Sequence, residues 1–167
     1  MTITLNLPNT IWLGGPNTKV GDLAAGVAIC PGMLVDKYVP SGTTNRLRPH
    51  ATAAVATPRM VATEQSMVNK TVNDGYAIND LVEASELAGG SSAWMLIASG
   101  QNIAFGAKLE SAGDGTLRVL AAGVALFQAL ESVNNSTGSA GPVGPAPNVG
   151  TTTALPVGAA RIRVEVV

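Results

Sequence analysis

The ionisable and nucleophilic side chains of this sequence form no recognisable catalytic motif. The single histidine, His50, stands beside a proline and an arginine, and no serine lies in a G-x-S-x-G nucleophile elbow. Gly26 and Gly32 are six residues apart with no Lys-Ser or Lys-Thr after them, so they do not form a phosphate-binding loop. We therefore predict a protein that is not an enzyme, with His50 on the surface or in a loop.

Carboxylates and the lone cysteine are the remaining groups that could do chemistry. Three carboxylate pairs are candidates to meet in space: Glu83 with Glu86, Glu110 with Asp114, and Glu64 with Glu131. Nothing in the sequence indicates that these carboxylates are buried, so we interpret them as solvated or turn residues. Cys30 is the only cysteine, which rules out an intramolecular disulfide and indicates a buried structural thiol. We predict no cofactor and no metal site.

Charge and hydropathy exclude two classes of partner. The formal net charge is −1, and the ten lysines and arginines are scattered, so the chain lacks the basic stripe that binds nucleic acid. No apolar stretch reaches the roughly 18 residues that span a membrane, and the first residues do not resemble a secretory signal. We expect a soluble protein, made in a cytoplasm, that binds neither nucleic acid nor membrane.

The composition favours many short strands over long helices. Hydrophobic residues make up 46% of the 167 residues but aromatic residues only 4%, so the core is built from small side chains. Nineteen glycines and ten prolines interrupt any long helix. We predict one all-β domain, a compact β-barrel or a β-sandwich of the jelly-roll type.

The clearest hairpin lies between residues 103 and 120. Ile103–Ser111 and Thr116–Leu120 are rich in apolar residues and flank Gly113-Asp114-Gly115, which suits the positive φ angles of a tight turn. A third strand is predicted between residues 124 and 133, because glycine bounds a run too short for a helix.

An earlier part of the chain resembles this hairpin and indicates an internal repeat of residues 25–66 and 99–133. The matched segments, at offsets of 74, 70 and 67 residues, are Gly26, Ile29 and Gly32 with Gly100, Ile103 and Gly106, then Leu47-Arg48 with Leu117-Arg118, and then Ala62-Thr63-Glu64 with Ala129-Leu130-Glu131. Loops of unequal length explain the shrinking offset. Chance similarity is the alternative, since glycine and alanine are abundant.

Further strands follow from alternation and hydrophobicity. They are Met1–Leu7, Arg59–Gln65, Tyr76–Ala84, Trp94–Ile97 and Ala160–Val167. In the last of these, Ile162, Val164 and Val166 are predicted to point inward, and Arg161, Arg163 and Glu165 outward. Asn73-Asp74-Gly75 predicts a second tight turn of the hairpin type.

Two segments are predicted to lie outside the β domain, which comprises residues 18–133 and 157–167. Residues 1–17 form an expected N-terminal arm, in which Trp12 either fills the base of the core or anchors a partner. Residues 134–156 are rich in Gly, Pro, Ser, Thr and Asn, which predicts a long loop or linker before the last strand.

Several segments resemble the head decoration, or cement, proteins of tailed bacteriophages. These segments are Arg59–Glu64, Lys70–Tyr76, Gly100–Asn102, Leu109–Leu117 and Arg161–Val166. The resemblance runs from about Ala25 to the end of the chain. It implies a β-rich, non-enzymatic module on the outer face of an icosahedral head, at local two-fold or three-fold positions. The Gly/Pro-rich segment 135–156 departs from the short members of that family, so the resemblance gives it no role.

The resemblance also implies partners and a location. The expected partners are the major capsid protein and further copies of the chain, as a homotrimer in preference to a dimer. The expected location is the virion head, after assembly in the host bacterial cytoplasm. The candidate interface residues are Ile3, Leu5, Leu7, Ile11, Trp12, Leu13, Arg161 and Arg163. The alternative is a carbohydrate- or receptor-binding β-module, for which the few aromatic residues provide little material.

Overall fold

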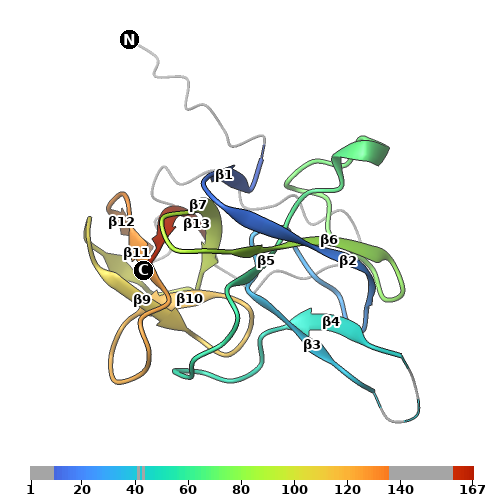
Figure 1. Cartoon of the computed structure of the whole chain (residues 1–167). Coiled ribbons are helices and arrows are strands. Elements are labelled where there is room, and N and C mark those ends of the chain that lie inside the picture. The colour runs from blue at the N-terminus through green and yellow to red at the C-terminus, as the bar shows by residue number, and fades with distance from the viewer. Residues whose placement is uncertain (1–9, 41, 43, 136–159) are drawn as a thin grey trace.

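The structure, a computed structural model, describes residues 10–40, 42, 44–135 and 160–167. These residues form thirteen strands and one turn of 3-10 helix, η1 (Ser66–Val68), so the predicted all-β fold is confirmed (Figure 1). The strands are β1 (Trp12–Gly14), β2 (Asn17–Ala25), β3 (Val35–Tyr38), β4 (Arg46–Pro49), β5 (Met60–Ala62), β6 (Leu81–Leu87), β7 (Ser92–Ile97), β8 (Asn102–Ile103), β9 (Lys108–Ser111), β10 (Leu117–Val119), β11 (Phe127–Ala129), β12 (Val133–Asn134) and β13 (Ala160–Val166).

The strands build two five-stranded rings, one after the other along the chain. The first ring, barrel 1, has the order β3-β4-β2-β6-β5, and an antiparallel bridge between Leu34 and Val61 brings its two ends together. The second ring, barrel 2, has the order β7-β10-β9-β11-β13 and closes where β13 pairs with β7. Figure 1 shows the two barrels side by side, with β1 added to β7.

The two barrels have the same strand order and the same register. In each, the first strand pairs in parallel with the third and antiparallel with the fifth. The second and third strands form an antiparallel hairpin, in which Asp36 faces Arg48 in barrel 1 and Glu110 faces Arg118 in barrel 2. The offsets of 74, 70 and 67 residues found in the sequence carry β3, β4 and β5 onto β9, β10 and β11. Barrel 2 therefore repeats the architecture of barrel 1.

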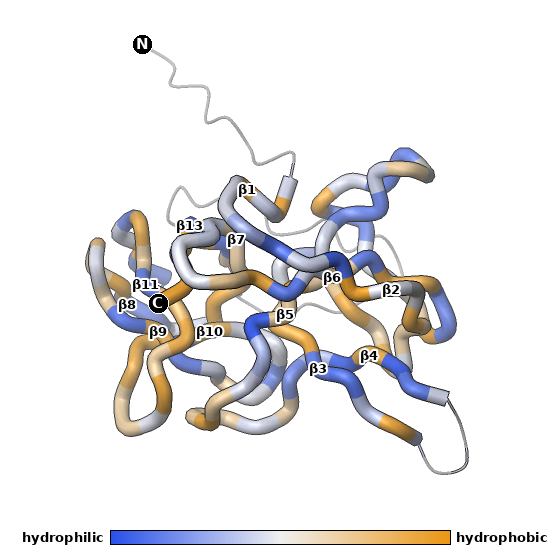
Figure 2. The backbone as a smooth tube through the Cα atoms, viewed as in Figure 1, coloured by the Kyte–Doolittle hydropathy of each residue, from blue (hydrophilic) through white to orange (hydrophobic). Residues whose placement is uncertain are grey.

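Each barrel has an apolar core, and the two cores meet at a joint between the barrels. Met60 and Ala62 of β5 face the core of barrel 1, whereas Val61 between them belongs to the apolar cluster of barrel 2, as the alternation of a strand requires. Leu34 also packs into the cluster of barrel 2, and Leu96 of β7 packs into that of barrel 1. In Figure 2, hydrophobic and hydrophilic stretches alternate along both barrels.

Backbone hydrogen bonds also cross the joint. The amide of Leu34 donates to the carbonyl of Gly115 at 2.8 Å, and the amide of Leu96 donates to the carbonyl of Gly32 at 2.9 Å. Gly32 and Gly115 have φ of +90° and +83°. A Cβ at Gly115 would lie 2.8 Å from Cβ of Pro49, so only glycine allows this close approach.

Several predicted strands begin or end elsewhere. The strand predicted for Tyr76–Ala84 is wrong at its start, because Asn79 adopts φ +73° in a turn and β6 begins only at Leu81. Tyr76 is buried and forms an isolated bridge with Ile29. The turn predicted at residues 73–75 lies earlier, where the amide of Asp74 donates to the carbonyl of Thr71 at 3.0 Å, and it does not join two hydrogen-bonded strands. The pairing of β9 with β10 and the strands β7 and β13 agree with the prediction. The single strand predicted over Ile103–Ser111 is wrong, because a turn at Gly106 (φ +80°) separates β8 from β9, and the strand predicted between residues 124 and 133 is reduced to β11 and the start of β12.

The described residues of both segments predicted to lie outside the β domain belong to the folded body. Residues 10–17 of the predicted arm belong to the folded body, since Ile11 is buried and its amide donates to the carboxylate of Glu64 at 2.9 Å. At the other boundary, Asn134 lies in β12 and Asn135 is buried. The predicted strand Met1–Leu7 and the loop residues 136–156 lie outside the described residues.

Candidate functional site

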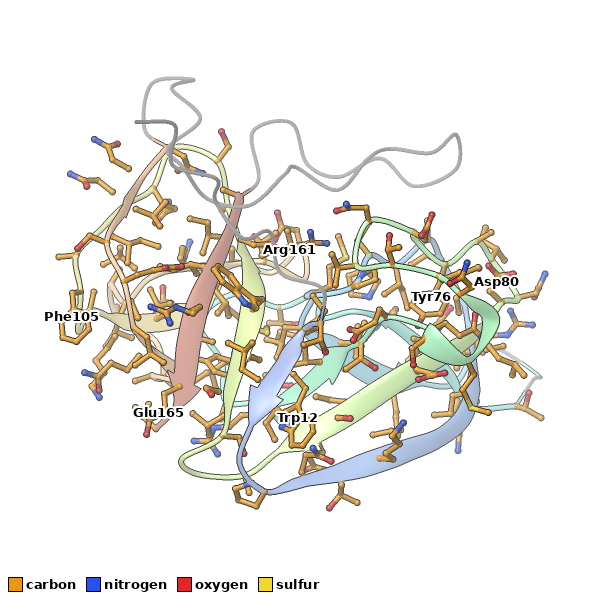
Figure 3. All side chains as sticks on the ribbon, turned by 90° about the horizontal axis from the view of Figure 1, so that it is seen from above. Trp12, Tyr76, Asp80, Phe105, Arg161 and Glu165 are labelled. Carbon is orange, nitrogen blue, oxygen red and sulfur yellow. The ribbon has the colours of Figure 1, made fainter. Side chains whose placement is uncertain are left out.

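Arg161 is a fully buried charged side chain and lies in the joint. Its Nη2 donates to the carbonyl of Pro31 at 3.1 Å and to the carbonyl of Val72, and its Nη1 donates to Oδ1 of Asn73 at 3.2 Å. Arg161 is on the outer face of β13, as the alternation predicts, but barrel 1 covers this end of the face and leaves Arg161 0% exposed. The predicted outward, partner-facing position is therefore wrong, and Arg161 joins the two barrels instead (Figure 3).

Burial changes the pKa of two groups at this joint. Loss of water lowers the pKa of Arg161 to about 10, although the nearby Cys30 and Glu64 act in the opposite direction. Loss of water also raises the pKa of the Cys30 thiol to about 11, partly offset by Arg161. The predicted buried thiol is confirmed. At neutral pH, Cys30 is an un-ionised thiol and therefore a weak nucleophile.

The histidine belongs to an ion-pair group on the outer face of barrel 1. His50 directly follows β4, so the predicted loop position is right, but the predicted surface position is wrong because the end of β4 lies against barrel 2 and His50 is buried there. Its Nδ1 lies 3.3 Å from Oδ2 of Asp36, and Nε of Arg48 donates to the other oxygen of Asp36 at 2.9 Å. This hydrogen bond to Asp36 raises the pKa of Arg48, whose guanidinium also lies over the ring of Tyr38.

Barrel 2 has a similar ion pair at the equivalent position. Glu110, interpreted from the sequence as solvated, is buried because the chain around Gly123 covers it. Burial acts to raise its pKa, but hydrogen bonds from Arg118 at 2.8 Å and from the amide of Gly123 at 2.7 Å lower it overall. Asp114 accepts from the amide of Thr116 at 2.9 Å, which agrees with a turn residue. Both carboxylates hold the fold together.

The other carboxylate pairs are used separately. Glu64 accepts from the amide of Ile11, and Glu131 accepts from the amide of Arg163 at 2.9 Å and pairs with its guanidinium. Glu83 pairs with Lys19 at 3.8 Å. Over residues 10–40, 42, 44–135 and 160–167, no group of three or more His, Cys, Asp or Glu side chains is placed to hold a metal ion.

Exposed apolar side chains are the surface features that remain for binding a partner. Of the candidate interface residues, Trp12 and Leu13 are each 40% exposed, and Arg163 is exposed beside Glu131. Ile11 is a correction, because it lies in the core at the joint. Ile3, Leu5 and Leu7 lie outside the described residues.

Sequence reasoning missed a second group of exposed apolar residues. Phe105 is 70% exposed and Leu81 is 54% exposed, and further exposed apolar side chains are Val27, Val39, Val55, Met67, Ile78, Val119, Val124 and Val167. The internal repeat was the signal that could have found Phe105 and Leu81. They occupy the positions at which the other barrel has Pro31 and Arg161, two residues of the joint.

Comparison with known proteins adds no further constraint: no model of a known protein family matches the chain, and no curated protein matches it. The described residues include no helix with the length and apolar character needed to cross a membrane.

Proposed function

We propose that this protein is a non-enzymatic structural protein of a virion that binds the outside of a phage head and bridges neighbouring major capsid subunits. The sequence resemblance to head decoration proteins suggests this role. The observation that carries it is the way the charged groups are used. Arg161 donates to backbone carbonyls inside the fold, and Glu110 and Asp36 pair with arginines, whereas large apolar side chains such as Trp12 and Phe105 are exposed.

The repeated architecture supports a bridging role. A chain with two barrels held by a packed joint offers contact surfaces on two sides of one rigid body, and two simultaneous contacts raise the overall affinity well above that of either one. Such binding needs contact area and no reactive group. Trp12 and Leu13 next to β7 are the surface that we assign to the capsid, since tryptophan frequently dominates binding at protein interfaces.

Co-sedimentation with purified heads tests this proposal. The wild-type chain is expected to pellet with heads that lack it, and Trp12→Ala is expected to reduce the apparent affinity by about tenfold or more. Met67→Ala is the matched control, because Met67 is 91% exposed on η1 and away from β1. A wild-type chain that stays in the supernatant at all concentrations refutes head binding, and retention on a glycan column would instead favour the carbohydrate-binding alternative.

A further inference from the structure

The joint between the barrels is head-to-tail, because each barrel uses a different part of the repeat. Barrel 1 contributes the turn at Pro31 and Gly32, together with Leu34, whereas barrel 2 contributes Leu96 and Arg161. A two-fold joint would use the same positions on both sides. A head-to-tail joint necessarily leaves one unused face on each barrel.

The register identifies the two unused faces. Leu81 pairs with Ala24 at the place in barrel 1 where Arg161 pairs with Leu96 in barrel 2, so Leu81 is the equivalent of Arg161. This surface, with the nearby Ile78, is the free face of barrel 1.

The turn before the second strand identifies the other face. Pro31 and Phe105 directly precede Gly32 and Gly106, whose amides both donate to the last residue of the fourth strand, at 2.8 and 2.9 Å. Phe105 is thus the equivalent of Pro31. Phe105, which is 70% exposed, therefore marks the free face of barrel 2.

The two free faces are complementary at the centre of the joint. Inside the chain, the guanidinium of Arg161 meets the carbonyl of Pro31, a polar contact. If a second copy repeated the same joint, Leu81 of one copy would meet Phe105 of the other. Leu81 stands where barrel 2 has the charged Arg161, and Phe105 stands where barrel 1 has the smaller Pro31; Leu81 and Phe105 are 54% and 70% exposed in the single chain. An exposed phenylalanine opposite an exposed leucine is the kind of contact that association would bury.

The surroundings of this contact are more polar than in the internal joint. Leu34 and Val61, which pack against barrel 2, are replaced in barrel 2 by Lys108 and Gln128, whose side chains share a hydrogen bond of 2.8 Å. A polar rim around an apolar centre is typical of interfaces that form and separate. Figure 3 shows Phe105 and Asp80, the neighbour of Leu81, at opposite ends of the molecule with Arg161 between them.

We propose that copies of this chain associate head to tail, with the free face of barrel 2 of one copy against the free face of barrel 1 of the next, so that the internal joint is repeated between molecules. Phe105 and Leu81 form the centre of this contact. A head-to-tail contact of this kind closes into a ring when its rotation permits. The proposal stands independently of the head-binding role.

Light scattering of the full chain during gel filtration tests the association. The wild type is expected to elute at multiples of the 16.8 kDa chain mass. Phe105→Asp and Leu81→Asp should each weaken association by at least about tenfold, because each places a charge at the contact centre. Trp12→Asp is the matched control and should associate like the wild type, since Trp12 is 40% exposed and lies away from both Phe105 and Asp80 in Figure 3.

Mixing the two variants separates this proposal from other kinds of association. Phe105→Asp keeps its barrel 1 face and Leu81→Asp keeps its barrel 2 face, so an equimolar mixture should form a dimer and stop there. Formation of this dimer also shows that both variants fold. A wild type that is monomeric at its highest soluble concentration, or a mixture that stays monomeric while the wild type associates, overturns the proposal. Co-sedimentation of the single variants with heads then reports on head binding separately.

Discussion

At the scale of single residues, the charged groups that the sequence offers as chemistry prove to be structural. The sequence shows which charged residues are present, but it does not show which of them are buried. Their burial depends on packing against the other barrel. Alternation along β13 correctly placed Arg161 and Arg163 on one face of the strand. Only the packing of barrel 1 against part of that face separates a buried arginine from an exposed one.

Replacing the two arginines should therefore have unequal effects. Arg161→Ala leaves the carbonyls of Pro31 and Val72 without their donor at a dry joint, and we expect it to lower the free energy of unfolding by about 2–4 kcal/mol. Arg163→Ala removes an exposed pair with Glu131 and should cost less than about 1 kcal/mol. Urea unfolding of both variants measures the difference, and equal losses would contradict the role of Arg161.

The Cys30 thiol gives a pH dependence on the alkaline side. Its pKa rises from 9.0 to about 11 on folding, so between these values the native state keeps a proton that the unfolded state has lost. The contribution of Cys30 to the free energy of unfolding is therefore fully present below pH 9. It is lost as the pH rises towards 11, by on the order of 2 kcal/mol. The pKa of Tyr76 is also raised, and Arg161 acts in the opposite sense, so the comparison must isolate Cys30.

Unfolding curves of the wild type and Cys30→Ala between pH 8 and 11 provide this comparison. The wild type should lose more stability than the variant over this range, because the variant has no thiol to ionise. Parallel loss in the two proteins would show that Cys30 does not contribute.

At the scale of elements, a turn and a strand with a strong local sequence signal were predicted correctly. Pairings between strands far apart in the sequence were not predicted. The turn at Gly113-Asp114-Gly115 predicted the β9–β10 hairpin, and strict alternation predicted β13, because both depend on residues close in sequence. The parallel pairing of β2 with β4, and of β7 with β10, has no local signature. Within the candidate interface, the exposure of Trp12 depends on how β1 pairs with β7, and the burial of Ile11 depends on its contact with Glu64. Both partners are remote in sequence.

Glycine substitutions test the contact between the β9–β10 turn and barrel 1. Gly115 and Gly100 both have positive φ, but a Cβ would clash with Pro49 only at Gly115 and would meet open space at Gly100. Gly100→Ala should cost about 1 kcal/mol from backbone strain, and Gly115→Ala about 2–3 kcal/mol from strain plus displacement of the joint. Thermal unfolding of both variants gives the comparison, and a smaller loss for Gly115→Ala would argue against close packing there.

At the scale of the whole molecule, comparison of the two repeated barrels explains which of their surfaces are polar and exposed to solvent. Leu34 and Val61 in barrel 1 are apolar because barrel 2 covers them, and their equivalents Lys108 and Gln128 are polar where no described segment covers them. The same fold position thus takes a different residue according to its neighbour. The sequence repeat pointed to the duplication, but not to which face of each copy would be buried.

Restoring the apolar pair should strengthen association. The double variant Lys108→Leu, Gln128→Val copies the surface with which barrel 1 binds barrel 2, and we expect it to tighten self-association by tenfold or more. Sedimentation equilibrium measures the constant. Lys19→Leu, which adds an apolar residue at an exposed position outside the two free faces, is the control for general stickiness. An equal increase in the association constant of the control would mean that added hydrophobicity strengthens association wherever it is placed on the surface.

The closure of each β-barrel affects how the protein behaves in concentrated solution. Strands inside a closed ring have a hydrogen-bonded neighbour on either side, so their amides and carbonyls are not open to the stacking that leads to fibrils. Encounters between such molecules are then decided by side chains at the surface. Point substitutions can accordingly redirect what the protein adheres to while its backbone scaffold is preserved.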